Sequence, residues 1–394
     1  MRSSTRRTIL WALALVVALS FVVFSFVQAG DGDDGSDGPV SPSPGVPDDP
    51  GRGCGEQAVT DPTDLSIDRT LARCGSGAPA AEPLARPATV RVALAERSES
   101  AAPLLVADAL GELAAENLQV EIVELDQGEA YRAMADGDVD VVVGGIDAPF
   151  FDAVHEGLDA RLVLGGPIAR EPGDLTVAQP GLWLRDDLIS DDDEWGNVEG
   201  QTVLVAGGPG SAALYPMDLT LAQNALGANA VDVTDASSES AASRLLNADV
   251  GGAWLTEPAA SRMHDQDAVR LVATVPGSEA IEGTVFSPRL VGDEREVGVA
   301  YARAIVRTIN THLADGYEDE ALTAVAEALD VGEDDVSAGP APLFDWEVRT
   351  GTTTRIQEAL IEVGAVRYEQ PAGERGLVDR TLVAEAVGGD AGGG

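Results

Sequence analysis

The sequence predicts an α/β fold, and two observations support this prediction. First, short apolar runs typical of buried strands alternate along the chain with segments whose apolar residues recur at helical spacing. Second, the stretch 202–226 contains one complete unit: a β-branched run at 202–206, a glycine-rich break, and a helical pattern of Leu214, Met217 and Leu221. Repeated strand–helix units form mostly parallel sheets that helices cover on both faces.

The first half of the folded region follows this alternation. Strands are predicted at 89–95, 120–125, 139–143 and 161–164. Helices are predicted at 103–117, 128–135 and 148–156. Because ligands of such sheets bind beyond the carboxyl ends of the strands, the loops after the first and third strands are candidate site segments.

The second half contains a similar unit between two predicted crossings from one lobe to another. The chain is expected to leave the first lobe near Trp183, in "GLWLRDD", and to return in "TVFSPRL" at 284–290. An acidic loop at 190–194 lies just after the first crossing. The remaining elements are strands at 202–206, 231–233, 251–255 and 269–275, and a helix around 241–247.

Three further helices are predicted after this unit and are expected to pack back on the first lobe. Asp293 and Glu296 form an acidic capping box at the start of the first one, which has a continuous apolar face. That face consists of Val297, Tyr301, Ile305, Ile309 and Leu313. The other two are predicted at 322–329 and 356–363, and Gly364 ends the last.

The glycine-rich break at 207–210 has three interpretations. Free amides at the start of the following helix, beside glycines that allow close approach, suit a small polar or anionic group. The G-x-G-x-x-A pattern that begins at Gly208 is a weak match to a dinucleotide fingerprint, because the acidic residue expected after the next strand is poorly placed. The third interpretation is a glycine turn that only joins strand to helix. The helix starts either with Ser211 as its cap or with Pro216 as its first residue.

The charge of the chain is strongly acidic and argues against several partners. Its 394 residues contain 25 Lys+Arg, all of them arginine, and 67 Asp+Glu, which gives a formal net charge of −42. Nucleic acid and anionic membrane surfaces are therefore poor partners. His155, His264 and His312 are scattered without ligand spacing, so no metal is expected, and no motif calls for a cofactor.

The N-terminal residues 1–29 predict export from the cytoplasm. Arginines precede the uncharged run 9–27, which is long enough for a membrane anchor and also ends near an acceptable signal-peptide cleavage site. Both interpretations place the rest of the chain outside the cell, tethered to the membrane or secreted. An acidic Gly/Pro linker follows at 30–88, and its two cysteines, Cys54 and Cys74, most simply form a disulfide there.

Five stretches along the body together resemble one family. They are "VRVALAERSESAAPLLVADALG", "MADGDVDVVVGGIDAPFFDAV", "GGPGSAALYP", "GGAWLTEP" and "REVGVAYARAIVRTIN". Over residues 89–366 the chain resembles the extracytoplasmic solute-binding proteins of ABC importers, in the branch for nitrate, sulfonate, taurine and thiamine precursors (SsuA/THI5-like). The resemblance implies a periplasmic-binding-protein-like (type II) fold, two α/β lobes joined by two crossovers. Lobe 1 would comprise 89–182 and 287–370, lobe 2 183–286, and a C-terminal tail 371–394.

The resemblance also implies a ligand cleft formed by loops of both lobes. The positions carried over are Ser98, Glu99, Ser100, Asp147, Ala148, Gly210, Ser211, Tyr215, Trp254 and Glu257. Glu99 and Asp147 are equally explained as charges at helix N-termini, and Trp254 as a core residue. If the carboxylates Glu99, Asp147 and Glu257 all face inward, the ligand is neutral, zwitterionic or amine-bearing rather than a simple anion.

The resemblance further implies a function without catalysis. A monomer would capture a small organic or oxyanion solute outside the cell and deliver it to ABC permease subunits. The sequence contains no G-x-S-x-G, H-E-x-x-H or G-x-x-x-x-G-K-[ST] motif. Two alternatives stay open: a membrane-anchored ligand-sensing ectodomain, and a pyrimidine-precursor enzyme of the same fold, although the chain lacks the cysteine-rich motif of such enzymes.

Overall fold

The computed structural model describes residues 54–75, 78–189 and 195–388, all within one compact unit, Gly51–Gly394. The predicted export segment, most of the linker before the cysteines, the acidic loop and the last residues of the chain lie outside these ranges. Among the described residues, no helix has the length and hydropathy of a membrane span.

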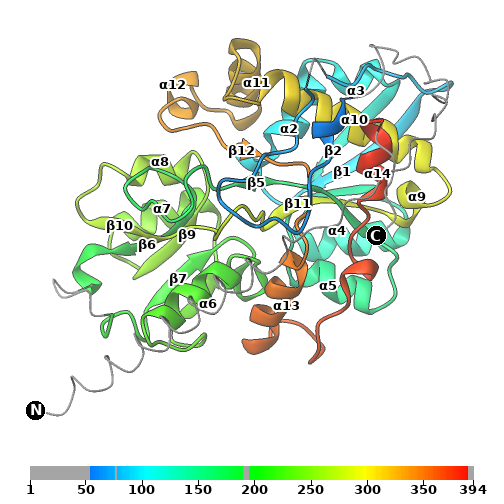
Figure 1. The fold of residues 1–394 in the computed structure, drawn as a ribbon. Coiled ribbons are helices and arrows are strands. Elements are labelled where there is room, and N and C mark those ends of the chain that lie inside the picture. Colours follow the sequence, from blue (N-terminus) through cyan, green and yellow to red (C-terminus); the bar gives the residue numbers. More distant parts are fainter. Residues whose placement is uncertain (1–53, 76–77, 190–194, 389–394) are drawn as a thin grey trace, which may run out of the picture. The chain divides into compact units, whose positions relative to one another are not determined.

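The first lobe is built on a five-stranded sheet in the order β2-β1-β3-β11-β4 (Figure 1). The strands are β1 (Ala88–Leu94), β2 (Leu118–Glu124), β3 (Val141–Gly145), β4 (Arg161–Gly165) and β11 (Glu282–Phe286). β1 pairs in parallel with β2 and β3, whereas β11 runs antiparallel between β3 and β4. The prediction of a crossing at 284–290 is wrong, because Val285 and Phe286 are buried in this sheet. The return from the second lobe is complete at Glu282.

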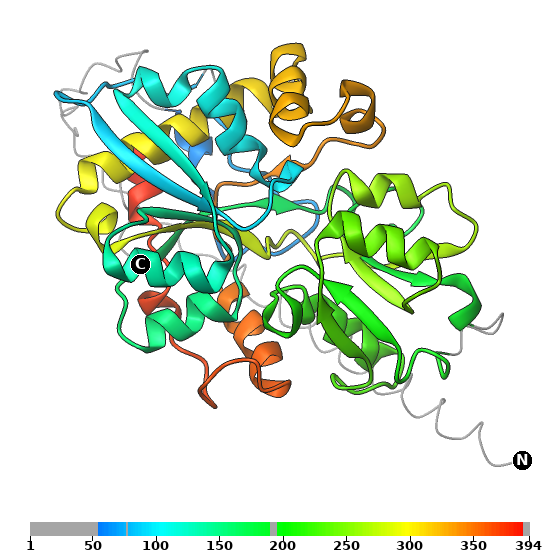
Figure 2. The same ribbon diagram turned by 180° about the vertical axis from the view of Figure 1, so that it is seen from behind.

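Helices cover both faces of the first sheet (Figures 1 and 2). One face carries α2 (Ala102–Ala109), α3 (Glu112–Ala115) and α10 (Arg295–His312), and the other α4 (Gln127–Asp136) and α5 (Ala148–His155). The helix predicted at 103–117 is split, because Gly111 between α2 and α3 adopts a left-handed conformation with φ 77°. The predicted capping box does not form, because α10 begins after Glu294 and no side chain caps it.

The second lobe is built on another five-stranded sheet, in the order β10-β6-β9-β7-β8. Its elements are β6 (Gly181–Arg185), β7 (Thr202–Val205), β8 (Asp232–Asp235), β9 (Gly252–Leu255), β10 (Val269–Ala273), α6 (Leu214–Gln223), α7 (Ser238–Leu246) and α8 (Ala259–Met263). β7 pairs in parallel with β8 and β9, and β6 is antiparallel to β9 and β10. Trp183, where the first crossing was predicted, is already a buried residue of β6.

The glycine-rich break turns the chain between β7 and α6. Gly207 is left-handed, with φ 83°, a short 3-10 turn covers Gly208–Gly210, and α6 begins at Leu214. Neither predicted helix start is correct. Ser211 lies before the helix, and Pro216 lies inside its first turn, where the N–H that proline lacks would have no helical partner.

The segments 169–180 and 274–281 connect the two lobes, and other parts of the chain pack beside them. β5 (Pro167–Ile168) pairs with β12 (Leu343–Phe344) before the first connection. The remaining helices are α9 (Pro288–Val291), α11 (Asp319–Leu329), α12 (Glu333–Val336), α13 (Thr352–Glu362) and α14 (Thr381–Ala386). α10 and α11 pack on the first lobe as predicted, but α13 contacts α6 of the second lobe as well as α5 (Figure 1).

Both ends of the described chain pack on the first lobe. A disulfide joins Cys54 and Cys74, and the Trp346 indole N–H donates to the carbonyl of Ala58 at 3.0 Å. The segment predicted as a tail contains α14, which packs against α10 and buries Leu382. The linker and tail predictions are therefore wrong for 54–75 and for the residues up to 388, because apolar side chains in both join the core.

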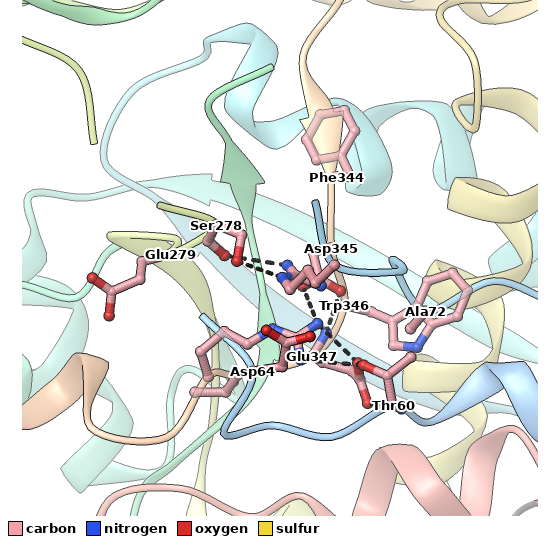
Figure 3. Close-up of polar contacts among 12 residues, drawn as sticks. Thr60, Asp64, Ala72, Ser278, Glu279, Phe344, Asp345, Trp346 and Glu347 are labelled. Atoms are coloured by element: carbon pink, nitrogen blue, oxygen red, sulfur yellow. Dashed lines mark hydrogen bonds and ion pairs between the residues drawn. The ribbon is translucent and has the colours of Figure 1, made fainter. Parts of the chain in front are cut away.

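Buried ion pairs surround the second connection (Figure 3). Arg69 donates to the carbonyl of Ser278 at 3.2 Å and pairs with the Asp345 carboxylate. Asp345 also accepts from Arg349 at 2.9 Å, and all three charged side chains are about 1% exposed.

Glu279, the next residue of this connection, extends away from Asp345 (Figure 3). Its carboxylate pairs with Arg355 and accepts from the Thr352 hydroxyl at 2.9 Å and from the Tyr215 hydroxyl of α6 at 2.7 Å. We call Arg69, Asp345, Arg349, Glu279 and Arg355 the crossover cluster.

Candidate functional site

A cavity of about 330 Å³ lies between the two lobes, beside the carboxyl ends of β1, β3, β7 and β9. Ligands of open α/β sheets bind at this end of the strands, and the volume is within the usual range for small-molecule sites. The predicted residues Ser98, Ser100, Asp147, Ser211 and Trp254 line it. The structure thus brings residues from both predicted walls to one cavity.

The first-lobe wall includes the turn that leads into α2. Ser98 and Ser100 lie there, just after β1, and the Ser100 hydroxyl donates to Oε1 of Glu282 at 3.2 Å. Glu282 is the first residue of β11, where the chain arrives from the second lobe. Burial raises the pKa of Glu282 to about 7, and the Glu96 carboxylate adds to this while the Ser100 hydroxyl opposes it.

Asp147 joins the two lobes. It follows β3, and its Oδ1 accepts a hydrogen bond from the backbone N–H of Ala212, in the second lobe, at 2.7 Å. The carboxylate folds back over Gly145, where a Cβ would lie 2.3 Å from Oδ1, and beside Gly207, where a Cβ would lie 3.1 Å from Oδ2. Burial raises the pKa of Asp147 to about 7, and the Ala212 amide lowers it by a smaller amount.

The second-lobe wall comes from the loops after β7, β8 and β9. Asp235 accepts from the backbone N–H of Gly207 at 2.9 Å, and Ser237 caps α7 by accepting from Ser240 N–H at 3.4 Å. Glu96 of the first lobe also lines the cavity, and its burial raises its pKa, while the Ser238 amide across the cavity lowers it.

Carboxylates therefore dominate the cavity. They belong to Glu96, Asp126, Asp147, Asp235 and Glu282. No arginine or histidine is among the described residues that line it, and the chain has no lysine. One further acceptor is unused: Gln127 donates through Nε2 to the carbonyl of Gly145 at 3.0 Å, but its buried Oε1 has no hydrogen-bond partner. The cavity is thus rich in hydrogen-bond acceptors and negative charge.

Comparison with known proteins identifies the fold. No protein-family model and no curated protein matches the sequence. The periplasmic aliphatic sulphonate-binding protein SsuA of Escherichia coli is 14% identical, with 75% of this chain and 92% of that chain covered and a TM-score of 0.54. The periplasmic nitrate-binding protein NrtA of Synechocystis PCC 6803 is 13% identical, with 76% of this chain and 88% of that chain covered and a TM-score of 0.56. The chain has the fold of periplasmic solute-binding proteins. The predicted α/β fold class is confirmed.

A third structure with this solute-binding-protein fold is the ligand-binding component of an ABC-type import system from Staphylococcus aureus, solved with zinc bound. It is 12% identical, with 76% of this chain and 98% of that chain covered and a TM-score of 0.57. In the part of the present chain that the structure describes, no group of three or more His, Cys, Asp or Glu side chains is arranged to hold a metal ion. The carboxylates of its cavity are therefore too dispersed to form such a group.

Several residues predicted for the cleft of this fold do not line the cavity. Glu99 is buried beside it and accepts from the Tyr317 hydroxyl at 2.7 Å, and burial raises its pKa to about 7. Ala148 and Gly210 lie where the lobes touch, since a Cβ on Gly210 would lie 3.3 Å from that of Ala148. Tyr215 donates to Glu279 in the crossover cluster.

Glu257 lines a smaller neighbouring cavity of about 50 Å³ instead. The two cavities share Ser100, Trp254, Ile281 and Glu282 as lining residues. Oε2 of Glu257 accepts from Ser261 N–H at 3.0 Å, whereas its buried Oε1 has no partner, and burial raises its pKa.

Several lining residues were not predicted from the sequence, for two reasons. Asp126 and Gln127 follow β2, and Asp235 is the last residue of β8, so the rule that sites form at carboxyl ends of strands could have found them. Glu282 gave no such signal, because it begins a strand. It reaches the cavity because β11 runs antiparallel to β3, which places its amino end beside the carboxyl end of β3.

Proposed function

We propose that this chain is the extracytoplasmic solute-binding component of an importer of the ABC type. The observation that supports it most directly is the cavity of about 330 Å³, which residues of both lobes line at the strand ends. A solute enclosed in this way contacts both lobes only when they are together, so binding favours the closed arrangement. A permease can then distinguish loaded from empty protein by its shape.

The bond from Ala212 to Asp147 and the contact between Gly210 and Ala148 support closure as the binding step. Both connect the lobes beside the cavity. No step of this function requires a catalytic residue, and the buried carboxylates serve as ligand contacts.

Native mass spectrometry tests the proposal on the full-length chain, purified in detergent from its own host. A retained small molecule of defined mass is expected, and its removal by dialysis should enlarge the radius of gyration in small-angle scattering. Protein that never carries a small molecule, and whose scattering does not respond to an extract of host metabolites, would contradict it.

A wedge between the lobes separates capture by closure from surface binding. Gly210→Trp should hold the lobes apart, because even a Cβ there lies 3.3 Å from Ala148. Retention of the small molecule should fall at least about tenfold, since contacts to one lobe are lost. Gly227→Trp is the matched control, because Gly227 is exposed and a Cβ there meets open space. Equal retention in the two variants would exclude closure as the binding step.

A further inference from the structure

The charge of the cavity indicates which class of solute it accepts. We propose that the solute is an organic cation that carries an amine or guanidine group, unlike the sulphonate and nitrate named for the structural neighbours. This inference rests on the proposed function. Three features of the cavity support it independently of one another.

The first feature is an uncompensated set of carboxylates. Glu96, Asp126, Asp147, Asp235 and Glu282 line the cavity, and none of the described lining residues is basic. Two buried carboxylates away from the cavities are instead paired with arginine. Asp345 pairs with Arg69 and Arg349, and the fully buried Glu116 pairs with Arg303 and Arg307. Asp147 is buried and Glu96 and Glu282 are half-buried. Because an unpaired desolvated charge is costly, a cationic ligand is the natural partner for these three.

The second feature is that the protein's own carboxylates already use the amides that would bind an anion. The loop before α6 offers free N–H groups of the kind that bind sulfonate or phosphate at helix N-termini. Here Asp147 accepts from Ala212 N–H at 2.7 Å, and Asp235 accepts from Gly207 N–H at 2.9 Å. An anion would have to displace these carboxylates and then remain beside them, which Coulomb repulsion opposes.

The third feature is a pair of buried acceptor oxygens that lack a hydrogen-bond donor. The buried Oε1 of Gln127 in the cavity and that of Glu257 in the neighbouring cavity have no hydrogen-bond donor. An ammonium or guanidinium group carries only donors and matches such acceptors. The buried aromatic residue Trp254 borders both cavities and supplies apolar surface for the carbon skeleton of an organic cation. A bare metal ion fits less well, because no close group of three metal-ligating side chains is found in the described residues.

Binding of a cation in this cavity should be coupled to the release of protons. Asp147, faced by Tyr131, Glu282 and the Ala212 amide, has its pKa raised to about 7, as has Glu282, which Ser100 and Glu96 face. A bound cation favours the ionised carboxylates, so binding releases protons. Affinity should therefore rise from pH 6 to pH 8 by about tenfold for each group that must ionise.

Isothermal titration of the ligand-stripped full-length protein tests the inference with putrescine and agmatine as cations, ethanesulfonate and nitrate as anions, and uracil as a neutral probe. Ionic strength is held constant. We expect heat only from the cations, a proton release that appears as a buffer-dependent enthalpy, and the pH dependence described above. Binding of ethanesulfonate, nitrate or uracil but of neither cation would overturn the inference while leaving the proposed function intact.

Single substitutions locate the binding. Asp147→Asn keeps an acceptor oxygen for Ala212 but removes the charge, and Glu282→Gln does the same beside Ser100. Each should weaken the better-bound cation about tenfold and reduce the proton release. Asp265→Asn, at an exposed position outside the cavity, is the matched control and should change neither. Equal affinity in all three variants would place the cation elsewhere and overturn the inference.

The wedge variant distinguishes cations that bind in the cavity from cations that bind to the acidic surface. Gly210→Trp leaves all five cavity carboxylates in place, yet it should abolish cation binding by preventing closure. If the cations bind Gly210→Trp as tightly as the parent, they bind the acidic surface rather than the cavity, and the inference fails. If a retained native solute proves to be an anion, the inference fails while the proposed function stands.

Discussion

Two regions of this molecule that contain carboxylates differ in how their charges are balanced. In the crossover cluster, Asp345 pairs with Arg69 and Arg349, and Glu279 pairs with Arg355. In the cavity, the buried Asp147 and the half-buried Glu282 accept only from an amide and a hydroxyl. Paired charges hold the connection between the lobes together, whereas the unpaired charges are expected to lower stability in the absence of a ligand. The two regions therefore contrast a structural use of carboxylates with the binding role proposed for the cavity.

The largest change in the free energy of unfolding is expected from a substitution in the crossover cluster. Asp345→Asn leaves Arg69 and Arg349 buried without their shared carboxylate, which should lower the free energy of unfolding by about 3 to 5 kcal/mol. Chemical denaturation of the purified protein measures this. A loss smaller than about 1 kcal/mol would mean that water or other groups compensate the two arginines, and the contrast with the cavity would disappear.

In the cavity, by contrast, removal of carboxylate charges is expected to stabilise the folded protein. Asp147→Asn combined with Glu282→Gln should raise the free energy of unfolding of the ligand-free protein at pH 8 by about 1 kcal/mol or more, because two desolvated charges are removed. Denaturation at pH 8 of parent and double variant measures the difference. Destabilisation by the double variant would show that the carboxylates are structural after all.

The pH dependence of that difference follows from the raised pKa values. In the unfolded chain these carboxyl groups ionise at about pH 4. In the folded protein Asp147 and Glu282 keep their protons up to about pH 7. The folded state therefore binds more protons between these values, and stability falls as pH rises through this window and levels off above it. The double variant should lack this part of the slope, which denaturation at several pH values detects.

A smaller effect is expected beside the cavity. Tyr317→Phe removes the hydroxyl that donates to Glu99 at 2.7 Å, and should cost about 1 to 2 kcal/mol because a buried acceptor loses its donor. It should also raise the pKa of Glu99 further, since that hydrogen bond lowers it. Thermal denaturation at pH 6 and pH 8 tests both statements, and the loss should be greater at pH 8, where Glu99 is ionised. Equal losses at both pH values would contradict this assignment.

The smallest effect is expected at the surface. Arg97 pairs with Glu124 at 2.7 Å, but both side chains are exposed to solvent. Arg97→Ala should change the free energy of unfolding by less than about 0.5 kcal/mol. Chemical denaturation of this variant gives an exposed reference for the substitutions in the crossover cluster and the cavity. If Arg97→Ala lowered the free energy of unfolding as much as Asp345→Asn, burial would not explain the strength of the ion pairs.

Much of the architecture could be predicted because it depends on local periodicity. The β-branched runs that became β1, β3 and β7 and the apolar face of α10 are visible in the sequence itself. Errors arose where a contact between distant segments decided the outcome. The segment 284–290 resembled a connection, yet pairing with β3 and β4 makes Glu282–Phe286 a central strand.

The candidate site was predictable to a smaller extent. Ser98 and Asp147 follow strands, and Trp254 lies near the carboxyl end of β9, where the general rule for α/β sheets places ligands. Tyr215 and Glu99 occupy similar positions in the sequence, but their side chains meet Glu279 and Tyr317 instead. Side-chain direction at the end of a strand depends on which distant partner is near, and sequence spacing does not contain that information.

The sequence alone determined the α/β class, the strong negative charge and the positions of most strands and helices, because strand and helix periodicities and charge are properties of neighbouring residues. Only the tertiary structure decided which carboxylates are neutralised. Asp345 and Asp147 are both single aspartates just after apolar residues, although Asp345 alone has an arginine, Arg349, four residues later. The fold adds Arg69 to that pair, whereas it brings Asp147 the amide of Ala212, and contacts across such separations depend on chain topology.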